Sequence, residues 1–483
     1  MFNSMRKWWP LVTVCLGTFM LLVDVTIVNV ALPRMAGDLY ASFDSLQWVV
    51  DGYALSLGVL LLGAGSLADR IGHRRLYAAG LVVFALSSLA CGLASDDTLL
   101  IAARVVQGIG GAALFTTTFA LLNSSYQGRS RGVAYGIWGG VSGAAAAIGP
   151  VLGGVLTDAL SWRWIFLVNL PISVAALVLT LTVLRPSPVF RGGRFDIAGF
   201  LTFTVAATAL TLAVIRSIPS LYVVSAVALA LFVLIERRSP APMIDLALLR
   251  NRTFTGVLIA ALLVNFAAFA MLTYTSIWLQ SLLGLTPLQA GLTALPMGVL
   301  SLIVSGVAGA RLHGRSPRVL IGVGMLLIFA GGLLAVWLVG PSSSWPALLP
   351  GFAIIGLGVG LVMPNLAESA MAAVPADRGG MAAGTLNTAR QLGFAIGVAV
   401  VGSAFASRAT SFLSSAGVRD SSDVAHGLAS GQVFGSIPEP LLRGAAATGL
   451  DVGFAVAAGV ALLAALAVFL LVRPAPKPEA VLV

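Results

Sequence analysis

The sequence predicts an all-α polytopic membrane protein, and its composition and its apolar runs carry that prediction. Of the 483 residues, 58% are hydrophobic and only 10% are charged, and the mean hydropathy is +1.00. Soluble domains contain about 25% charged residues. Apolar runs of about 20 residues recur along the chain, and each is long enough to cross a hydrocarbon core of about 30 Å. Barrel strands would be shorter and would alternate apolar with polar residues.

We expect fourteen membrane-spanning helices, which end where proline, glycine and charged residues interrupt the apolar runs. The first run follows a basic start, as in a signal peptide, but residues 11–32 are too long for a signal h-region. That run is therefore expected to remain as the first helix. The expected spans are 11–32, 46–66, 76–94, 98–121, 133–157, 163–184, 196–215, 219–235, 254–280, 287–310, 318–339, 346–366, 381–406 and 450–472.

Two similar loops indicate a duplicated architecture. The loop "GSLADRIGHRR" at 65–75 and the loop "GARLHGRSPR" at 309–318 both begin with glycine and end in arginine, and they lie eight expected helices apart. Two six-helix bundles with a two-helix insert produce that offset. Duplicated bundles are a common transporter plan, with the substrate site between the halves. The expected domains are an N-terminal bundle at 1–184, the insert with its linkers at 185–253, and a C-terminal bundle at 254–483 with a large external loop at 407–449.

The positions of arginine and lysine set the expected orientation. The net charge is +10, from 28 Lys and Arg against 18 Asp and Glu. Most basic residues fall in segments that become cytoplasmic when the N-terminus is placed inside, as the positive-inside rule requires. We therefore expect a multi-pass protein of the cell membrane with both termini cytoplasmic, and the charge implies no nucleic-acid partner. The exceptions are Arg34, Arg163, Arg216, Arg408, Arg419 and Arg443 outside, and Arg104 and Arg390 within spans.

Three ionisable residues stand inside the expected spans of the first half. Counting 1.5 Å per residue from the outer ends of the spans puts Asp24, Asp51 and Arg104 roughly 12, 8 and 9 Å deep. Burying a charge is costly, and an ionisable residue inside a membrane is functional by default. We interpret Asp24 and Arg104 as a proton-coupling pair, with Asp51 as a further candidate. The alternative is a static ion pair that fixes helix packing.

The loop at 65–75 is a candidate cytoplasmic gate. Gly65 and Gly72 permit tight turns or close approach. Asp69 can accept hydrogen bonds at a helix N-terminus, and Arg70 and Arg74 are expected to face the cytoplasm. Ordinary topogenic charge would explain the arginines without a further role, but it would not explain Asp69. We therefore predict a latch that breaks and reforms.

The fifth expected helix contains glycines four residues apart, a spacing that lets helices approach closely. Within it, Pro150 removes a backbone donor and can kink the helix. Gly149, Pro150, Gly153 and Gly154 are therefore a candidate pivot, although glycine spacing alone more often serves packing.

Polar residues of the second half are candidates for lining a substrate cavity. In "GTLNTARQLGFAIG", Asn387, Arg390 and Gln391 recur at helical spacing and can share a face. Asn265, Tyr274 and Trp278 lie along the ninth expected helix. The alternatives are hydrogen bonds between helices for the polar groups and an interfacial belt for the aromatic ones.

Several stretches resemble the fourteen-helix drug:proton antiporter branch of the major facilitator superfamily. "LVDVTIVNVALP" at 22–33 resembles its helix-1 motif, and "RVVQGIGGA" at 104–112 its helix-4 motif. "GSLADRIGHRR" resembles the superfamily loop motif, and "AAAIGPVLGG" at 145–154 the antiporter motif. The resemblance implies rocker-switch alternating access and efflux driven by proton entry. It also implies that Asp24 and Arg104 act in coupling and Asp69 in the inner gate.

The expected function is a proton-coupled antiporter that exports small amphipathic molecules, such as drugs, antibiotics or related metabolites. The alternatives are a dedicated exporter of one biosynthetic metabolite and a proton-coupled uptake symporter. An enzyme is disfavoured, because no cluster resembles a metal site or a nucleophile triad and no histidine falls inside a span. We expect no cofactor and no metal, with protons, substrate and the bilayer as partners and a monomer as the functional form.

Overall fold

The computed structural model of the chain describes residues 7–186, 189, 195–216, 218–312, 315–432 and 434–473. Within these ranges the regular structure is helical, and no strand occurs. The long helices of the first part are α2 (Trp9–Leu39), α3 (Phe43–Ile71), α4 (His73–Gly92), α5 (Asp97–Ser125), α6 (Arg129–Ala159) and α8 (Asn169–Val183), with the short α7 (Trp164–Leu167). They are followed by α9 (Ile197–Ile215), α10 (Pro219–Arg238), α11 (Arg252–Ile277), α12 (Pro287–Thr293), α13 (Leu295–Arg311), α14 (Pro317–Leu338), α15 (Leu349–Ala372), α16 (Gly379–Ser415), α17 (Ser421–Ala429) and α18 (Glu439–Leu471).

Side-chain caps explain where several helices begin. The Ser42 side chain accepts from the Ser45 amide before α3, and Asp96 accepts from the Leu99 amide before α5. Such oxygen atoms satisfy amide groups that have no partner inside the helix. The polar connections between the apolar runs therefore contain the start signals of the spans.

In the part of the chain that the structure describes, twelve helices are long and apolar enough to cross a membrane. The apolar stretch Leu295–Gly309 of α13 is shorter than these twelve. The 31-residue α6 is also not among the twelve. The chain is a multi-pass helical membrane protein, but length and composition do not establish the fourteen spans that the sequence predicted. The polar stretch at 407–449 is largely helical, because α16 continues to Ser415, α17 follows, and α18 begins at Glu439.

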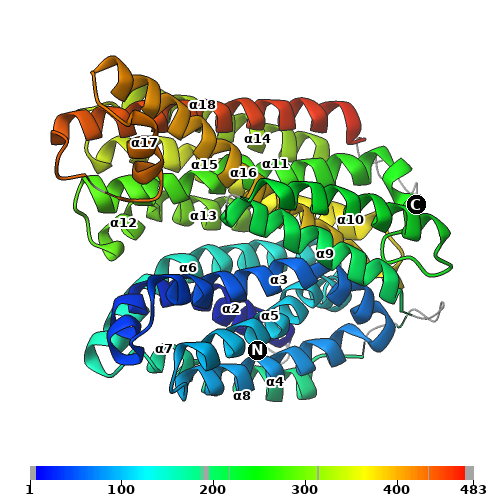
Figure 1. Cartoon of the computed structure of the whole chain (residues 1–483). Coiled ribbons are helices and arrows are strands. Elements are labelled where there is room, and N and C mark those ends of the chain that lie inside the picture. The colour runs from blue at the N-terminus through cyan, green and yellow to red at the C-terminus, as the bar shows by residue number, and fades with distance from the viewer. Residues whose placement is uncertain are drawn as a thin grey trace.

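The helices gather into two groups that lie side by side (Figure 1). In the first group α3 and α4 pack on α5, and α2 packs on α6; in the second, α14 packs on α15 and α11 on α16. Helices α9 and α10 pack on each other, and α9 also contacts α3. We call the first group, α2–α8, the N-half and the second, α11–α18, the C-half. The halves meet mainly where α3 lies against α16 and α6 against α13.

Candidate functional site

The carboxylate of Asp24 and the guanidinium of Arg104 form an ion pair inside the N-half. Asp24 lies in the middle of α2 and Arg104 in the first third of α5, and both side chains are fully buried. Arg104 Nη1 is 2.5 Å from Asp24 Oδ2. Arg104 Nε donates to the Val49 carbonyl at 3.0 Å, and the guanidinium lies 4.1 Å from the centre of the Tyr53 ring. Pairing offsets the large cost of burying either charge alone.

Three uncharged side chains complete the surroundings of the pair. Gln107 Nε2 and Asn169 Nδ2 donate to Asp24 Oδ1 at 3.0 and 3.1 Å. Gln107 Oε1 accepts from Arg104 Nη1 at 2.8 Å, and its Nε2 also donates to Ser88 Oγ at 2.7 Å. Asp24 therefore accepts three hydrogen bonds from side chains of α5 and α8. This donor set suits a carboxylate, since a protonated acid would need an acceptor.

Sequence reasoning missed Ser88, Gln107 and Asn169. Gln107 stands three residues after Arg104, and helical spacing puts the two on one face, so a signal for it was present. Ser88 on α4 and Asn169 at the start of α8 carry no such signal. They reach the pair because α4 and α8 pack against each other and α8 against α2.

Asp51, the further coupling candidate, lies on α3 with a partly exposed side chain. The hydrogen-bond partners of Asp24 and Arg104 given above do not include it. Its role in coupling therefore stays a prediction.

Asp69, near the end of α3, connects the two halves. Its Oδ1 accepts from the Gly380 amide at 2.5 Å, and its Oδ2 accepts from the Met381 amide at 2.7 Å. Both donors belong to the first turn of α16, whose amide groups have no partner inside the helix. A helix N-terminus also favours a negative charge. Asp69 therefore caps α16 from the opposite half, and the buried His73 Nε2 lies 3.5 Å from its Oδ1.

Glycines bring α3 and α16 into backbone contact beside Asp69. A Cβ on Gly65 would clash with the Gly380 carbonyl, and one on Gly384 would lie 2.9 Å from the Leu61 carbonyl. We call Gly65, Asp69, Gly380 and Gly384 the α3–α16 seam. Larger residues at these glycines would hold the two halves apart.

A second seam lies between α6 and α13 and consists of Gly132, Gly136, Ser305 and Gly309. A Cβ on Gly132 would lie 2.6 Å from the Gly309 carbonyl, and one on Gly136 would lie 2.6 Å from the Ser305 carbonyl. The residue before α6 is Gly128, which has no side chain that could cap the helix. The α6–α13 seam therefore rests on close packing.

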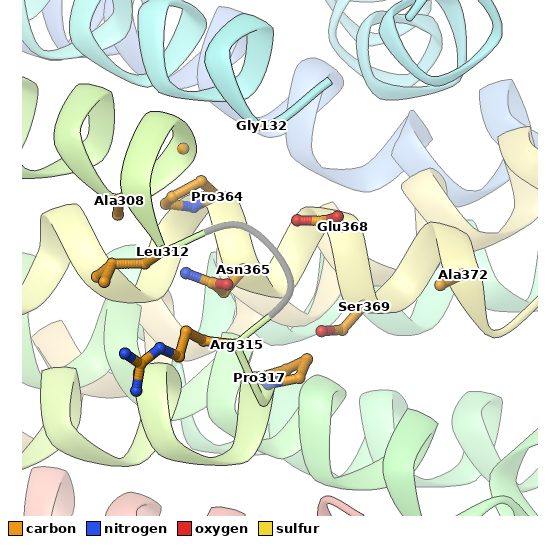
Figure 2. Close-up of a pocket in the computed structure, with 11 residues that line it drawn as sticks. Gly132, Ala308, Leu312, Arg315, Pro317, Pro364, Asn365, Glu368, Ser369 and Ala372 are labelled. Atoms are coloured by element: carbon orange, nitrogen blue, oxygen red, sulfur yellow. The ribbon is translucent and has the colours of Figure 1, made fainter. Parts of the chain in front are cut away.

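A cavity of about 200 Å³ adjoins the α6–α13 seam (Figure 2). Asn365, Glu368 and Ser369 of α15 contribute polar groups to it, as does Arg315 in the connection from α13 to α14. The remaining lining residues are Gly132, Ala308, Gly309, Leu312, Pro317, Pro364 and Ala372. Sequence reasoning did not single out this polar cavity.

The other gate candidates of the 65–75 loop do not bridge the halves in the contacts described. Gly72 ends α3 with a φ of 97°, in the region that favours glycine. Arg74 donates to two carbonyls at the end of α8, at 3.1 and 2.5 Å, and so stays within the N-half. Arg70 Nη2 donates at 3.2 Å to the carbonyl of Ala241, which follows α10. Arg70 thereby ties the loop to the linker between α10 and α11.

The candidate pivot glycines differ in their surroundings. A Cβ on Gly149 would clash with the Thr26 hydroxyl of α2, so this glycine allows α2 and α6 to approach closely. Gly153 is buried, and a Cβ on Gly154 would meet nothing within 4 Å. The side chain of Pro150 lies outside the described residues. Close packing is evident at Gly149, and a pivot stays a prediction.

Three of the cavity candidates are engaged within the C-half. The Tyr274 hydroxyl donates to the Val398 carbonyl at 2.8 Å, and its ring stacks on Phe405 with 5.8 Å between the centres. Trp278 is buried at the start of a π-helical turn. Asn265 Nδ2 donates to a carbonyl one turn earlier in α11 at 3.2 Å. These contacts support the fold of the C-half.

The candidates on α16 are placed differently. Asn387 is fully buried, and its Oδ1 accepts from Arg390 Nη1 at 3.3 Å. The Arg390 guanidinium lies 5.9 Å from the centre of the Phe115 ring on α5. Gln391 is partly exposed. Arg390 therefore faces the N-half.

Comparisons with known proteins identify the family. The family described as Major Facilitator Superfamily matches residues 14–398. The multidrug resistance protein Stp of Mycobacterium tuberculosis (strain CDC 1551 / Oshkosh) is 39% identical over 406 residues, covering 82% of this chain and 75% of that protein. The tetracenomycin C resistance and export protein of Streptomyces glaucescens is 31% identical over 511 residues, covering 98% and 93%.

A solved structure agrees in fold. The crystal structure of the human organic anion transporter MFSD10 aligns with a TM-score of 0.64 at 17% identity, covering 96% of this chain and 99% of that one. At this identity the likeness shows the fold alone. The chain, a multi-pass transporter and not an enzyme, therefore belongs to the major facilitator superfamily.

Proposed function

We propose that the protein is a proton-coupled antiporter that exports small amphipathic molecules by alternating access. The observation that carries the proposal is the buried Asp24–Arg104 pair, because a titratable group inside a membrane can load and unload a proton when its pairing changes. Relatives named for multidrug resistance and for export support the outward direction.

Asp24 is the proposed proton carrier. In the described conformation Arg104, Gln107 and Asn169 all donate to its carboxylate. A proton arriving from outside would remove the charge that these donors hold and would weaken the contact between α2 and α5. When the halves have reoriented, renewed pairing with Arg104 would release the proton inside. Asp51 is the next candidate for this role.

The inner gate consists of the two seams. With the N-terminus in the cytoplasm, the end of α3 and the start of α6 lie on the cytoplasmic side, so the described conformation is closed to the cytoplasm. Asp69 would act as the latch of this closure, because its carboxylate joins α3 to the start of α16. The candidate pivot glycines of α6, Gly149 among them, would let α6 move against α2.

We further propose fourteen spans, with α6 and α13 added to the twelve candidates. The two helices pack on each other, and each also packs on a candidate span, α2 for α6 and α15 for α13. A 31-residue helix is about 45 Å long, which exceeds the hydrocarbon core. The protein would work as a monomer of two six-helix halves and an insert.

The orientation can be checked by labelling. In a background without Cys15 and Cys91, a membrane-impermeant thiol reagent added outside should modify a cysteine at exposed position 414 and spare one at exposed position 75. The opposite pattern would reverse the proposed orientation.

The proton gradient is sufficient for such export. A potential of 100 mV is worth about 2.3 kcal/mol per charge, so 150 mV supplies roughly 3.5 kcal/mol per proton. Since about 1.4 kcal/mol corresponds to a tenfold ratio, one proton could sustain roughly a several-hundred-fold gradient of a neutral substrate.

The direct test is Asp24→Asn in proteoliposomes. Asparagine keeps the size of the side chain but does not titrate, so transport driven by a pH gradient should be abolished. Exchange of substrate between equilibrated compartments needs no net proton movement and should survive. Asp423→Asn removes a carboxylate from the exposed face of α17 and serves as the matched control. Uphill transport by Asp24→Asn with stoichiometric proton uptake would move the carrier to another residue.

A dedicated exporter of one metabolite is the second candidate. Relatives named for single compounds favour it, among them the tetracenomycin C protein and the methylenomycin A resistance protein of Bacillus subtilis, which is 33% identical over 404 residues. Proton release from proteoliposomes, screened across cationic, neutral and anionic amphiphiles, would separate the two. One active compound favours the dedicated exporter, and proton movement in the same direction as substrate would instead indicate a symporter.

A further inference from the structure

Arg390 lies near the middle of the expected span 381–406, where the halves meet. It follows the first residue of α16, Gly379, by eleven positions, which is about 16 Å along the helix. The hydrocarbon core is about 30 Å thick. Its guanidinium lies 5.9 Å from the Phe115 ring of the opposite half. In the described conformation it also lies six residues beyond Gly384, about 9 Å along the helix, on the outer side of the closed α3–α16 seam.

The charge of Arg390 lacks the partner that Arg104 has. Arg104 pairs with Asp24, whereas no ion pair of the described residues includes Arg390. Its one hydrogen bond within the described chain goes to the Asn387 amide oxygen at 3.3 Å. The side chain of Arg390 is partly exposed, but its Nε is buried, and the attraction of a cation to an aromatic ring replaces neither a hydrogen-bond acceptor nor an opposite charge.

Two hydrogen-bond donors at this site lack an acceptor among the described residues, one on Arg390 itself and one on Asn387. Arg390 Nε and Asn387 Nδ2 are buried, and neither finds a hydrogen-bond partner in the part of the chain that the structure describes. Asn387 is 0% exposed. Buried donors without an acceptor are costly, so natural structures seldom keep them without a reason. Both groups can only donate, and what they lack is an acceptor, preferably one with negative charge.

We propose that Arg390 and Asn387 bind an anionic group of the transported molecule, a carboxylate, phenolate or sulfonate attached to an apolar body. A guanidinium fork matches the oxygen pair of a carboxylate or sulfonate and can donate to a single phenolate oxygen, and the Phe115 ring offers an apolar surface beside it. A lipid headgroup stays at the membrane surface, about 16 Å away, which favours a substrate that enters between the halves. The proposal rests on the proposed function in one respect: the substrate site lies between the halves.

The test is equilibrium binding to the purified full-length protein in lipid nanodiscs, measured by calorimetry. Three matched probes share one apolar body: anthraquinone-2-carboxylate, anthraquinone-2-carboxamide and 2-(aminomethyl)anthraquinone. The wild type should bind the acid at least about tenfold more tightly than the amide, because a hydrogen bond to a charged group is worth roughly that factor or more. The amine should bind most weakly.

Variants assign the preference to Arg390. Arg390→Gln and Arg390→Met should lower the affinity for the acid about 10- to 100-fold and change the affinity for the amide by less than about threefold. Arg390→Lys should keep part of the preference, because it keeps the charge but not the fork. Arg408→Gln removes the same charge from an exposed position of the same helix and should change nothing.

Several results would overturn the proposal. These are no measurable binding of the acid at millimolar concentration, equal binding of all three probes, or stronger binding of the amine. A loss of acid and amide affinity together in Arg390→Gln would also contradict it. If nanodiscs with phosphatidylglycerol abolish the preference seen in zwitterionic discs, a lipid headgroup is the ligand. Binding is measured without a gradient, so a failure of proton coupling would leave these results unchanged.

Discussion

Two seams join the halves at one end of the molecule. Both contain closely packed glycines, but only the α3–α16 seam, as defined above, includes a charged residue. At each seam a Cβ would clash with a carbonyl of the other half, from Gly65 onto Gly380 and from Gly309 onto Gly132. At the α3–α16 seam Asp69 adds two hydrogen bonds to the start of α16. At the α6–α13 seam the residue before α6 contributes no side-chain cap.

The difference shows how one end of a transporter can combine firm closure with release. Close glycine packing depends on shape alone, so it resists separation in every charge state. Hydrogen bonds to a carboxylate are about twice as strong as neutral ones and depend on its charge. We expect the α3–α16 seam to act as the switch and the α6–α13 seam as the surface on which the halves turn.

The largest effect should follow from overfilling a seam. Gly309→Val places a branched side chain against the Gly132 backbone, and overpacking of this kind costs about 1–3 kcal/mol. The closed population should fall by roughly 5- to 150-fold relative to the open one. Spin labels on exposed positions 127 and 315, read by pulsed distance measurements, would report the separation of the cytoplasmic ends. Gly65→Val should act in the same direction.

Gly306 provides the matched control for this experiment. It lies on α13 three residues before Gly309, and a Cβ there would meet nothing within 4 Å. Gly306→Val should therefore leave the distance distribution as in the wild type. Equal opening by both variants would show that helix propensity, not the seam, sets the closure.

The next effect should come from the charge at the α3–α16 seam. Asp69→Asn leaves one oxygen acceptor and turns an amide NH₂ toward a backbone N–H, so we expect a loss of about 1–2 kcal/mol of closure. Transport should fall about 5- to 30-fold, while insertion and thermal unfolding stay close to the wild type. The distance measurement above gives the closed population directly. Normal transport at normal expression would reduce Asp69 to a topology signal.

The charged residues of the molecule show which contacts could be predicted from the sequence. Counting residues from the span ends put Asp24 and Arg104 at similar depth, and their side chains are in contact in the structure. The partner of Asp69 was not predictable, because Gly380 lies 311 residues later and has no side chain to signal a role.

Other differences have the same physical origin. Asn169 reaches Asp24 only through the packing of α8, which leaves no periodic signal in the sequence. Arg74, predicted from its loop to serve the gate, binds carbonyls at the end of α8, because the long side chain finds acceptors within its own half. Local patterns thus predicted the helices and the charged motifs, whereas contacts between distant helices required the fold.

A smaller effect should come from the uncharged donors to Asp24, which lie within one half. Asn169→Leu removes one hydrogen bond to the carboxylate, worth about 1.5 kcal/mol. Transport driven by a pH gradient should therefore fall by at most about tenfold, since about 1.4 kcal/mol corresponds to a tenfold ratio. Transport assayed in proteoliposomes would show the loss, and Ser88→Ala, which removes a group that contacts only the amides, should lower transport less. Transport at the wild-type rate would mean that Asn169 serves packing alone.

The smallest effect on gating should come from replacing Arg74. It lies in the same loop as Asp69, but its hydrogen bonds go to its own half, whereas those of Asp69 go to the other half. Arg74 satisfies two carbonyls at the end of α8, where the helix leaves acceptors without partners and favours positive charge. Arg74→Gln should lower the free energy of unfolding by about 1 kcal/mol, since the side chain is partly exposed. Because both contacts lie within the N-half, the distance between labels at 127 and 315 should not change, and transport should fall less than about threefold. Thermal unfolding in detergent and the distance measurement, made on the same preparations, separate the two effects. Opening as large as that of Asp69→Asn would show that the loop acts on the gate as one unit, and the contrast between a bridging carboxylate and an arginine held within one half would then fail.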